Sequence, residues 1–591
     1  MAVKEQFTFH LLDYLVFIGI LLGSAAVGLC FSIQDKRKRR DITTQSYLMG
    51  DRKLPLIPVA ISLLVSFQSA ILILGTSSEM YLRGTTWWWS GIGISLSALL
   101  TCYVFVPVFY HLRLTSVYEY LEARFDSRGV RWLGAGFYLM VSVIYLSIAM
   151  YAPSVALEQV TKIMPLWLLI LLAGLVCTFY VVVGGMKAVI WTDALQGVFI
   201  MVALLIIAVQ GTLKIGGMGD VLRISRDRGR LIYFDYNLDP FVYMNSWTAI
   251  IGQLFSWLGW YGINQSSVQR YCGMETVRKG QSAVLLNIPG TIMILTVVCY
   301  CGLVMFAYFE YCDPLSAKLV SDRDQLFPFY VMDVMGSIPG IPGLFVACLY
   351  AGTLSTVSSG LNSLAAVTYE DFLKGRVAKW PRERVTVLTR VLCFMFGVVS
   401  TGFAFLAPYL GGMLQAALSL MGAVNGPLTG MFLVGVLLPW ANKRGVIFGA
   451  VISIAFMLWL CIGALGGAVH SDFLSVNTSN CQQMYGVAAN ATRLAPNRHV
   501  YGLDKMYTLS PGLYDLIGIA IVFLFTVPAS YLTGFADPNT IDLKLVHPWL
   551  RRALKSSRNA VEESVLLKPV QQDGNGNSSD SSVEAPKRLI R

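Results

Sequence analysis

Two hydroxyl residues stand side by side in an apolar part of the chain, at Ser355 and Thr356. The surrounding stretch Ala351–Ser363 reads AGTLSTVSSGLNS and is dense in hydroxyl groups. Small hydroxyl residues also serve plain helix packing, but packing does not require two adjacent ones, because neighbours on a helix point about 100° apart. Two adjacent hydroxyls with free backbone carbonyls suit a small hard cation that takes oxygen ligands. Sodium is the expected ion, since the sequence offers no acidic cage for calcium.

A second apolar stretch carries polar residues near its middle. It reads ISLLVSFQSA over residues 61–70, with Ser66, Gln68 and Ser69 far from either end of the apolar run. Polar residues at membrane depth indicate a backbone that leaves the helix to line a cavity. We therefore expect a broken helix at this position.

Few ionisable residues lie within the apolar stretches, and those that do are usually functional because they are costly there. Glu79 lies near one end of the second stretch. Asp193 follows the turn Gly184-Gly185-Met186-Lys187 and begins the next helix. Asp193 is either a first-turn charge favoured by the helix dipole or a carboxylate on a cation path.

The composition identifies the setting in which these residues act. Of the 591 residues, 55% are hydrophobic and 13% are charged, and the mean hydropathy is +0.61. Soluble domains carry about 25% charged residues, so a soluble enzyme, a disordered chain and a collagen-like chain are all excluded. The sequence predicts an all-α polytopic membrane protein. The sequence shows no metal-ligand spacing, no nucleophile–base pair and no phosphate loop, so we expect no enzyme and no organic cofactor.

A window of about 20 apolar residues per span identifies thirteen candidate transmembrane helices. They lie near 11–33, 54–81, 85–111, 130–159, 165–183, 187–212, 243–264, 282–309, 343–367, 385–408, 411–439, 445–467 and 513–534. The first exceeds the h-region of a signal peptide, and the basic run Lys36–Arg40 follows it directly.

The net charge of +11 is spread over short segments between the spans, which is how charge sets membrane orientation rather than how it binds nucleic acid. The run at Lys36–Arg40 predicts an extracellular N-terminus. Loop 213–240 does not fit this charge pattern, because it is expected outside yet carries several arginines. The expected cytoplasmic segments are 112–128, 266–280 with Arg270, Arg278 and Lys279, 370–386, 442–444 and a disordered tail over 536–591.

The polar segment 468–512 is expected outside the cell, at the plasma membrane. It holds two glycosylation sequons, at Asn477 and Asn490. Cys312 and Cys481 both fall in outside loops, where they either form a disulfide or remain two thiols. In the tail, Glu562–Leu567 fits an acidic dileucine signal that would bind a clathrin adaptor.

The thirteen spans divide into two units of five. Residues 1–53 form the N-terminus, first helix and basic linker, and residues 440–535 hold the last two helices. Between them lie units 54–212 and 243–439, joined by an outside loop at 213–242. An odd number of spans in each unit inverts the second unit relative to the first. The second and seventh spans then correspond, and both are interrupted by polar residues, which indicates a binding site at the midplane.

At these residues the chain resembles the sodium/solute symporter family over roughly 45–535. The motifs are TSVYEYLE at 115–122 with Arg124-Phe125, GGMKAVIWTD at 184–193, YGINQSSVQRY at 261–271, AGTLSTVSSGLNS at 351–363 and GPLTG at 426–430. The resemblance is strongest to the branch that carries multivitamins, short monocarboxylates and iodide, and it implies a LeuT-like five-plus-five inverted repeat with an extra N-terminal helix.

The resemblance also implies site residues. One sodium would be held by the carbonyls of Val65, Gln68 and Gly352 and the hydroxyls of Ser355 and Thr356. A second sodium would use Ser66, Asp193, Gln196 and Gln265. The substrate residues would include Phe67, Leu72, Tyr145 and Trp257.

Leu72 departs from the family pattern, because the iodide and sugar carriers have glutamine at the matching place. An apolar pocket at the positive end of a broken helix suits an organic anion such as biotin, pantothenate or a short monocarboxylate. We therefore expect a sodium-coupled symporter of small organic anions. The alternatives are an iodide or other small-anion symporter, and a membrane sensor that binds solute or sodium without transport.

Overall fold

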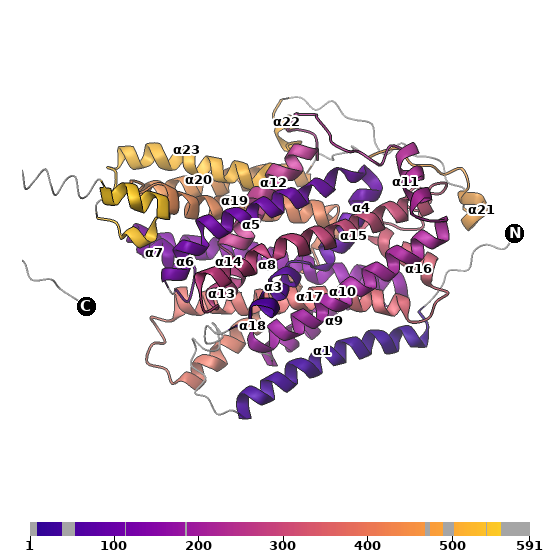
Figure 1. Cartoon of the computed structure of the whole chain (residues 1–591), viewed down its shortest axis with the longest axis horizontal. Helices are drawn as coiled ribbons and strands as arrows, with labels where there is room; N and C mark the ends of the chain where they lie inside the picture. The colour runs from indigo at the N-terminus through magenta and orange to yellow at the C-terminus, as the bar shows by residue number, and fades with distance from the viewer. Residues whose placement is uncertain are drawn as a thin grey trace, which may run out of the picture.

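The computed structural model describes residues 9–37, 54–112, 114–162, 164–183, 186–466, 473–487, 502–538 and 540–556. Within these ranges the protein is all-helical and has no strand. Figure 1 shows the helices packed side by side along the long axis of the molecule. The expected all-α architecture is confirmed.

Every predicted span coincides with a described helix, although fewer than thirteen meet a strict test of length and apolarity. Eight helices are long and apolar enough to cross a membrane, and two bent pairs raise that number to ten in the described part of the chain. The matching helices are α1 (Leu11–Arg37), α3 (Leu56–Ser66) with α4 (Ala70–Arg83), α5 (Ser90–Val104) with α6 (Val106–Leu112), α8 (Arg128–Thr161), α9 (Leu166–Val183), α10 (Met186–Ile215), α12 (Ser246–Gly262), α15 (Asn287–Tyr308), α17 (Ile341–Val367), α18 (Arg382–Ala404), α19 (Met413–Leu437), α20 (Lys443–Gly466) and α23 (Tyr514–Leu532).

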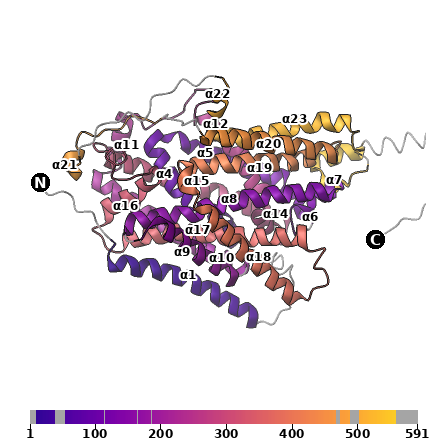
Figure 2. The same ribbon diagram turned by 180° about the vertical axis from the view of Figure 1, so that it is seen from behind.

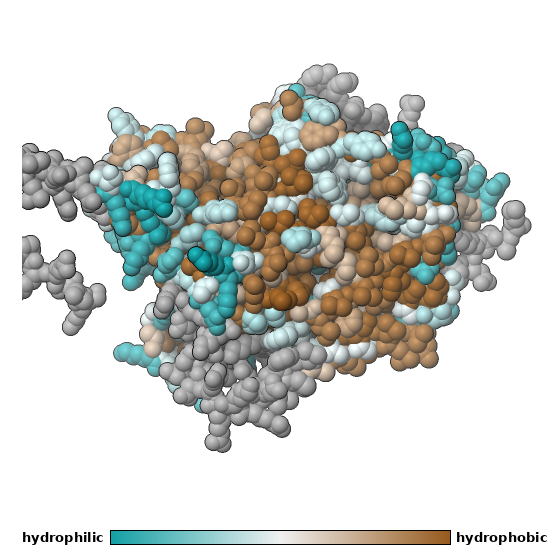
Figure 3. Space-filling view, in the orientation of Figure 1, coloured by the Kyte–Doolittle hydropathy of each residue, from teal (hydrophilic) through white to brown (hydrophobic). Residues whose placement is uncertain are grey.

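The molecular surface has the distribution of polarity that a membrane demands. Figure 3 shows hydrophobic side chains over the middle of the molecule and hydrophilic ones at its two ends. Among the apolar side chains of the helices, Phe179 of α9 and Val198 of α10 are 73% and 57% exposed. An exposed apolar surface of this extent marks a membrane or partner interface, and on a bundle of apolar helices long enough to span a bilayer it is the surface suited to face lipid.

The segments that sequence reasoning assigned to one side of the membrane meet at one end of the molecule, near α7 (Glu119–Phe125), which we call the α7 end (Figure 1). Arg131 reaches both Glu122 and Asp371, at 2.8 and 2.5 Å. Arg124 donates to the carbonyls of Gly435 and Leu438. These contacts join segments 112–128, 370–386 and the loop before α20.

The loops predicted to lie on the opposite side meet at the other end, beside α11 (Met218–Asp227), which we call the α11 end (Figure 1). Arg230 donates to the carbonyl of Ser475 at 3.0 Å. The amide of Asp313 donates to the carbonyl of Asn477 at 2.9 Å. A disulfide joins Cys312 to Cys481, whose Cα atoms are 4.8 Å apart. Asn490 and Glu562–Leu567 lie outside the described residues.

This disulfide predicts a redox-dependent stability. Reducing it should lower the free energy of unfolding by about 2–4 kcal/mol, since a cross-link restricts the unfolded chain. Thermal unfolding of the purified protein with and without dithiothreitol measures the effect. The double variant Cys312→Ser with Cys481→Ser is the control, and its melting temperature should not respond to the reductant. An equal response of both proteins would contradict the prediction.

The two repeats are visible in their broken helices. α3 and α4 are bent by 56° at a break over Phe67–Ser69. Five spans later, α12 ends at Gly262 and α13 (Gln265–Cys272) begins after Ile263 and Asn264. The side chain of Asn264 accepts from the amide of Ser266 and so caps α13. The interruptions expected in the second and seventh spans are therefore present.

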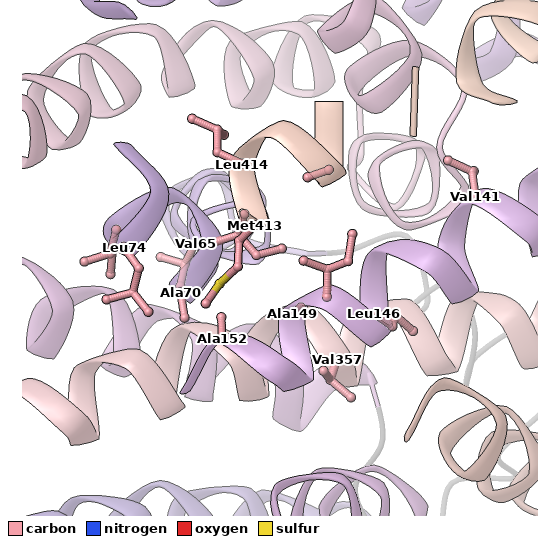
Figure 4. Close-up of a cluster of buried hydrophobic side chains, with 14 of the residues drawn as sticks. Val65, Ala70, Leu74, Val141, Leu146, Ala149, Ala152, Val357, Met413 and Leu414 are labelled. Carbon is pink, nitrogen blue, oxygen red and sulfur yellow. The ribbon is translucent and has the colours of Figure 1, made fainter. Parts of the chain in front are cut away.

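The core holds these broken helices together through apolar packing. Figure 4 shows side chains from five helices in one cluster: Val65 of α3, Ala70 of α4, Leu146 of α8, Val357 of α17 and Leu414 of α19. All are buried. α17, which belongs to the second unit, is thereby packed against α3, α4 and α8 of the first.

The N-terminal helix α1 lies at one edge of the molecule, while α20 and α23 lie at the opposite edge (Figures 1 and 2). Asp13 of α1 is fully buried. Its Oδ1 accepts from the amides of Gly340 and Gly343, at 2.7 and 3.2 Å. A Cβ on Gly343 would lie 2.2 Å from the carbonyl oxygen of Asp13, so the glycine allows this close approach. α1 therefore caps the start of α17, which sequence reasoning did not foresee.

Loss of this cap should destabilise the fold. Asp13→Ala leaves two amides at the start of α17 without their acceptor, and we expect it to cost about 1–3 kcal/mol. Asp13→Asn keeps an acceptor oxygen and should lose less. Thermal unfolding of the purified variants measures the difference, and equal melting temperatures for Asp13→Ala and the wild type would show that the cap is dispensable.

Candidate functional site

The candidate site is centred on the break between α3 and α4, where α17 passes closest to it. The break exposes backbone carbonyls because Phe67–Ser69 leave the helix. The Ser66 carbonyl accepts from the Thr356 hydroxyl at 2.8 Å. A Cβ on Gly352 would lie 2.8 Å from the Gln68 carbonyl oxygen. The backbone at Gln68 thus faces the backbone of α17 at Gly352 and Thr356, although these residues come from distant parts of the chain.

Asp193 of α10 connects the two repeats at this point. Its Oδ2 accepts from the hydroxyl of Ser62 at 2.6 Å and from that of Ser66 at 3.4 Å. Its Oδ1 accepts from the Ser355 hydroxyl at 2.7 Å. The carboxylate is fully buried. It therefore holds α3, α10 and α17 together and does not serve as a simple first-turn charge.

Two buried amide side chains add uncommitted oxygens to this cluster. The Gln68 Oε1 and both amide atoms of Gln196 have no hydrogen-bond partner among the described residues. A buried polar group left unpaired costs about 1–3 kcal/mol, and an amide oxygen is a ligand that hard cations accept. The donor set at the break, which is carbonyl, hydroxyl, amide and carboxylate oxygen, fits a sodium ion.

Gln265, the remaining member of the second predicted sodium set, makes different contacts. Its amide donates to the Thr115 carbonyl at 2.7 Å and accepts from the Val117 amide at 2.9 Å. These bonds tie the start of α13 to the segment before α7.

A small cavity of about 20 Å³, room for about one water molecule, lies beside the break. Aromatic rings and hydroxyls share its lining. The lining residues are Ser66, Phe67, Tyr138, Ser142, Tyr145, Leu146, Trp260, Asn264, Ser266, Thr356, Ser359 and Gly360. A small solute with an apolar body and a polar end matches this surface.

Two of the four predicted substrate residues, Phe67 and Tyr145, line the cavity, and two do not. Trp257 packs edge-on against Phe67 and donates to Gln253. Trp260, one turn further along α12, lines the cavity in its place, with its ring 4.9 Å from that of Tyr145. Leu72 of α4 is not among the lining residues and instead packs, partly buried, against the apolar core.

A family model for sodium:solute symporters matches residues 47–453, which is more than half of the chain. The chain belongs to the sodium:solute symporter family. Human sodium-coupled monocarboxylate transporter 1 is 41% identical to this symporter over 546 residues, which are 90% of this chain and 89% of that one. Sodium-coupled monocarboxylate transporter 2 of Danio rerio is 37% identical, covering 92% and 86% of the two chains. The human sodium/iodide cotransporter is 36% identical, covering 99% and 91%.

The fold of the symporter is shared with a solved structure. A sodium-coupled sialic acid symporter in a substrate-bound, outward-open state superposes with a TM-score of 0.69 at 22% identity. The match covers 90% of this chain and all of the other. This likeness confirms the expected LeuT-like fold.

Sequence reasoning gave no site role to one residue beside the proposed sodium ligands, Arg270 of the motif YGINQSSVQRY. It was counted among the charges of the expected cytoplasmic segment 266–280, yet it is only 3% exposed, so it lies inside the protein and not in a solvent-facing loop. Its Nη2 donates to Ser359 at 2.6 Å and lies 3.3 Å from Asp193 Oδ2. The clue was its place on a short polar stretch directly after the interrupted seventh span, because such a stretch can fold back into the protein.

Proposed function

We propose that the symporter couples the downhill entry of sodium to the uptake of a small organic anion by alternating access. The observation that carries this proposal is the buried carboxylate of Asp193. It is bonded to Ser62 and Ser66 of the broken span and to Ser355 of α17, beside the cavity. A cation at this point would touch both repeats at once.

The proposed sodium ligands are those expected from the sequence. The first set is Val65, Gln68, Gly352, Ser355 and Thr356, and the second is Ser66, Asp193, Gln196 and Gln265. Because the ligands come from both repeats, bound sodium would stabilise one arrangement of the repeats over the other. A ligand shifts an equilibrium only by its difference in affinity for the two states. A set of ligands drawn from both repeats provides that difference in sodium affinity, because the set is complete in only one of the two states.

The substrate class follows from the cavity and from the relatives. The aromatic rings of Phe67, Tyr145 and Trp260 suit an apolar body, while hydroxyls suit a carboxylate. Two of the relatives named above carry monocarboxylates by name. A short monocarboxylate is therefore the first candidate, with vitamins such as biotin and pantothenate next. Iodide is the second candidate, favoured by the 36% identity to the iodide cotransporter.

The orientation proposed here places the α11 end outside the cell and the α7 end in the cytoplasm of a plasma-membrane protein with thirteen spans. Asn477 and Asn490 would then be glycosylated. The backbone of Asn477 is hydrogen-bonded and its side chain accepts from the Ser479 amide. We assign the symporter no enzymatic activity, and we propose a clathrin adaptor as partner of Glu562–Leu567.

Electrophysiology of cells expressing the symporter tests the function. Lactate, biotin, pantothenate, iodide, glucose and choline are applied in sodium buffer and in sodium-free buffer. We expect inward current with lactate or a vitamin only when sodium is present, and none with glucose or choline. Binding of these solutes without their accumulation in proteoliposomes would show a sensor instead of a transporter.

A further inference from the structure

Arg270 and Asp193 form an isolated ion pair inside the symporter. The guanidinium Nη2 lies 3.3 Å from the Asp193 carboxylate, and the two side chains are 4% and 0% exposed. No other ion pair involves either residue in the described part of the chain. A buried charge without a partner is strongly unfavourable, so each of the two requires the other, or a substitute for it.

The guanidinium holds the same oxygens that the second proposed sodium would use. Nη2 donates to Ser66 Oγ at 2.8 Å and to Ser359 Oγ at 2.6 Å, and contacts Asp193 Oδ2. A sodium ion bound to Ser66 and Asp193 would leave two cations sharing one carboxylate. Sodium binding at Asp193 therefore requires Arg270 to find another anion.

The anion that pairs with Arg270 would be a carboxylate bound in the cavity. Arg270 contacts four serine hydroxyls, and three of them, Ser66, Ser266 and Ser359, line the cavity. A carboxylate bound to these cavity-lining hydroxyls would be one hydrogen-bonded group away from the guanidinium. The planar fork of arginine matches a carboxylate with two parallel hydrogen bonds, so a small shift of the side chain would pair them.

We propose that Arg270 exchanges partners during transport. In the substrate-free symporter it is paired with Asp193, and when sodium takes Asp193 it pairs with the carboxylate of the substrate. The charges that change partners stay balanced, because one ion pair is replaced by two. This inference rests on the proposed function, since it requires sodium at Asp193 and an anion in the cavity.

The exchange means that binding of sodium favours binding of the anion, and binding of the anion favours binding of sodium. Sodium frees Arg270 for the anion, and the anion frees Asp193 for sodium, so the two bind with a positive coupling that is equal in both directions. Arg270 also becomes the residue that selects an anion over a neutral analogue of the same shape.

Binding of radioactive sodium and of lactate to the purified symporter tests the exchange, with lactamide as the uncharged analogue of lactate. Arg270→Gln should lower lactate affinity by about 10- to 100-fold, the effect of losing a charged hydrogen bond. It should abolish the preference for lactate over lactamide. Its affinity for sodium without lactate should equal or exceed that of the wild type, because Asp193 is released. Arg270→Lys keeps the charge and should keep part of the preference.

Two variants separate this role from a structural one. Arg124→Gln removes a buried arginine that donates to backbone carbonyls at the α7 end, and it should keep the lactate preference. Asp193→Asn with Arg270→Gln restores charge balance, so it should fold even if Arg270→Gln does not, and it should still lack the preference. Retained preference in either folded Arg270→Gln protein, or parallel loss of sodium and lactate binding, would overturn the inference.

Failure of the proposed function has a different signature. If the wild type binds no lactate in sodium buffer, the monocarboxylate assignment fails. The sodium measurement by itself then tests the exchange. Sodium binding by Arg270→Gln that equals or exceeds that of the wild type supports the exchange, and weaker sodium binding refutes it.

Discussion

Replacing Ser355 and Thr356 together with alanine should abolish sodium-dependent uptake and leave the amount of symporter at the cell surface unchanged. The Ser355 hydroxyl donates to Asp193 and the Thr356 hydroxyl donates to the Ser66 carbonyl. The double change removes two proposed sodium ligands, together with one contact from α17 to α10 and one from α17 to the broken span. We take each lost oxygen ligand to cost about 1.5–3 kcal/mol, as for a hydrogen bond to a charged group, so sodium affinity should fall by more than about 100-fold.

The matched control for this experiment is on the same helix. Thr353→Ala also removes a buried hydroxyl, but Thr353 donates to the Ala149 carbonyl of α8 at 3.1 Å and does not face the break. Uptake as a function of sodium concentration should be close to that of the wild type for Thr353→Ala. Normal sodium dependence in the double variant would refute the assignment of Ser355 and Thr356.

A single methyl group at Gly352 should weaken sodium binding nearly as strongly. Its Cβ would lie 2.8 Å from the Gln68 carbonyl oxygen, which is closer than two such atoms can approach. Either α17 or the break must move, and overpacking of this kind costs about 1–3 kcal/mol. Because the displaced atoms are the proposed ligands, we expect Gly352→Ala to raise the sodium concentration for half-maximal uptake by about 10- to 100-fold.

Gly136→Ala provides the comparison, because nothing lies within 4 Å of a Cβ at that position of α8. The measurement is uptake against sodium concentration at fixed substrate, with surface labelling to correct for expression. A Gly352→Ala protein with the sodium dependence of the wild type would show that the close approach of α17 to the break does not matter for the ion.

Local composition was sufficient to predict the breaks and the family. A polar residue in the middle of an apolar helix is costly unless the backbone opens there, so Ser66, Gln68 and Ser69 indicate a break without any knowledge of their neighbours. The adjacency of Ser355 and Thr356 is equally local. The motifs around them identify the family, because those motifs are continuous stretches of sequence.

Helical periodicity could not choose between the two tryptophans of α12. Trp257 and Trp260 are three residues apart and lie on nearly the same face of the helix. Both rings pack edge-on against Phe67, but Trp260 lines the cavity, whereas Trp257 does not and donates to Gln253. Which of two neighbouring side chains reaches a cavity depends on the elements packed around them.

The charged residues show most clearly which features are local in the sequence and which depend on the tertiary structure. Hydropathy alone established a membrane protein whose interior is nearly free of charge, because each apolar span is a local property of the chain. Whether a given charge near the end of a span is in water or in protein depends on a partner elsewhere. Arg270 is buried because Asp193, 77 residues away, is there to pair with it, and Asp13 is buried because it caps a helix that begins more than 300 residues later. Such pairings depend on distances between separate helices, which are set only when the whole bundle packs.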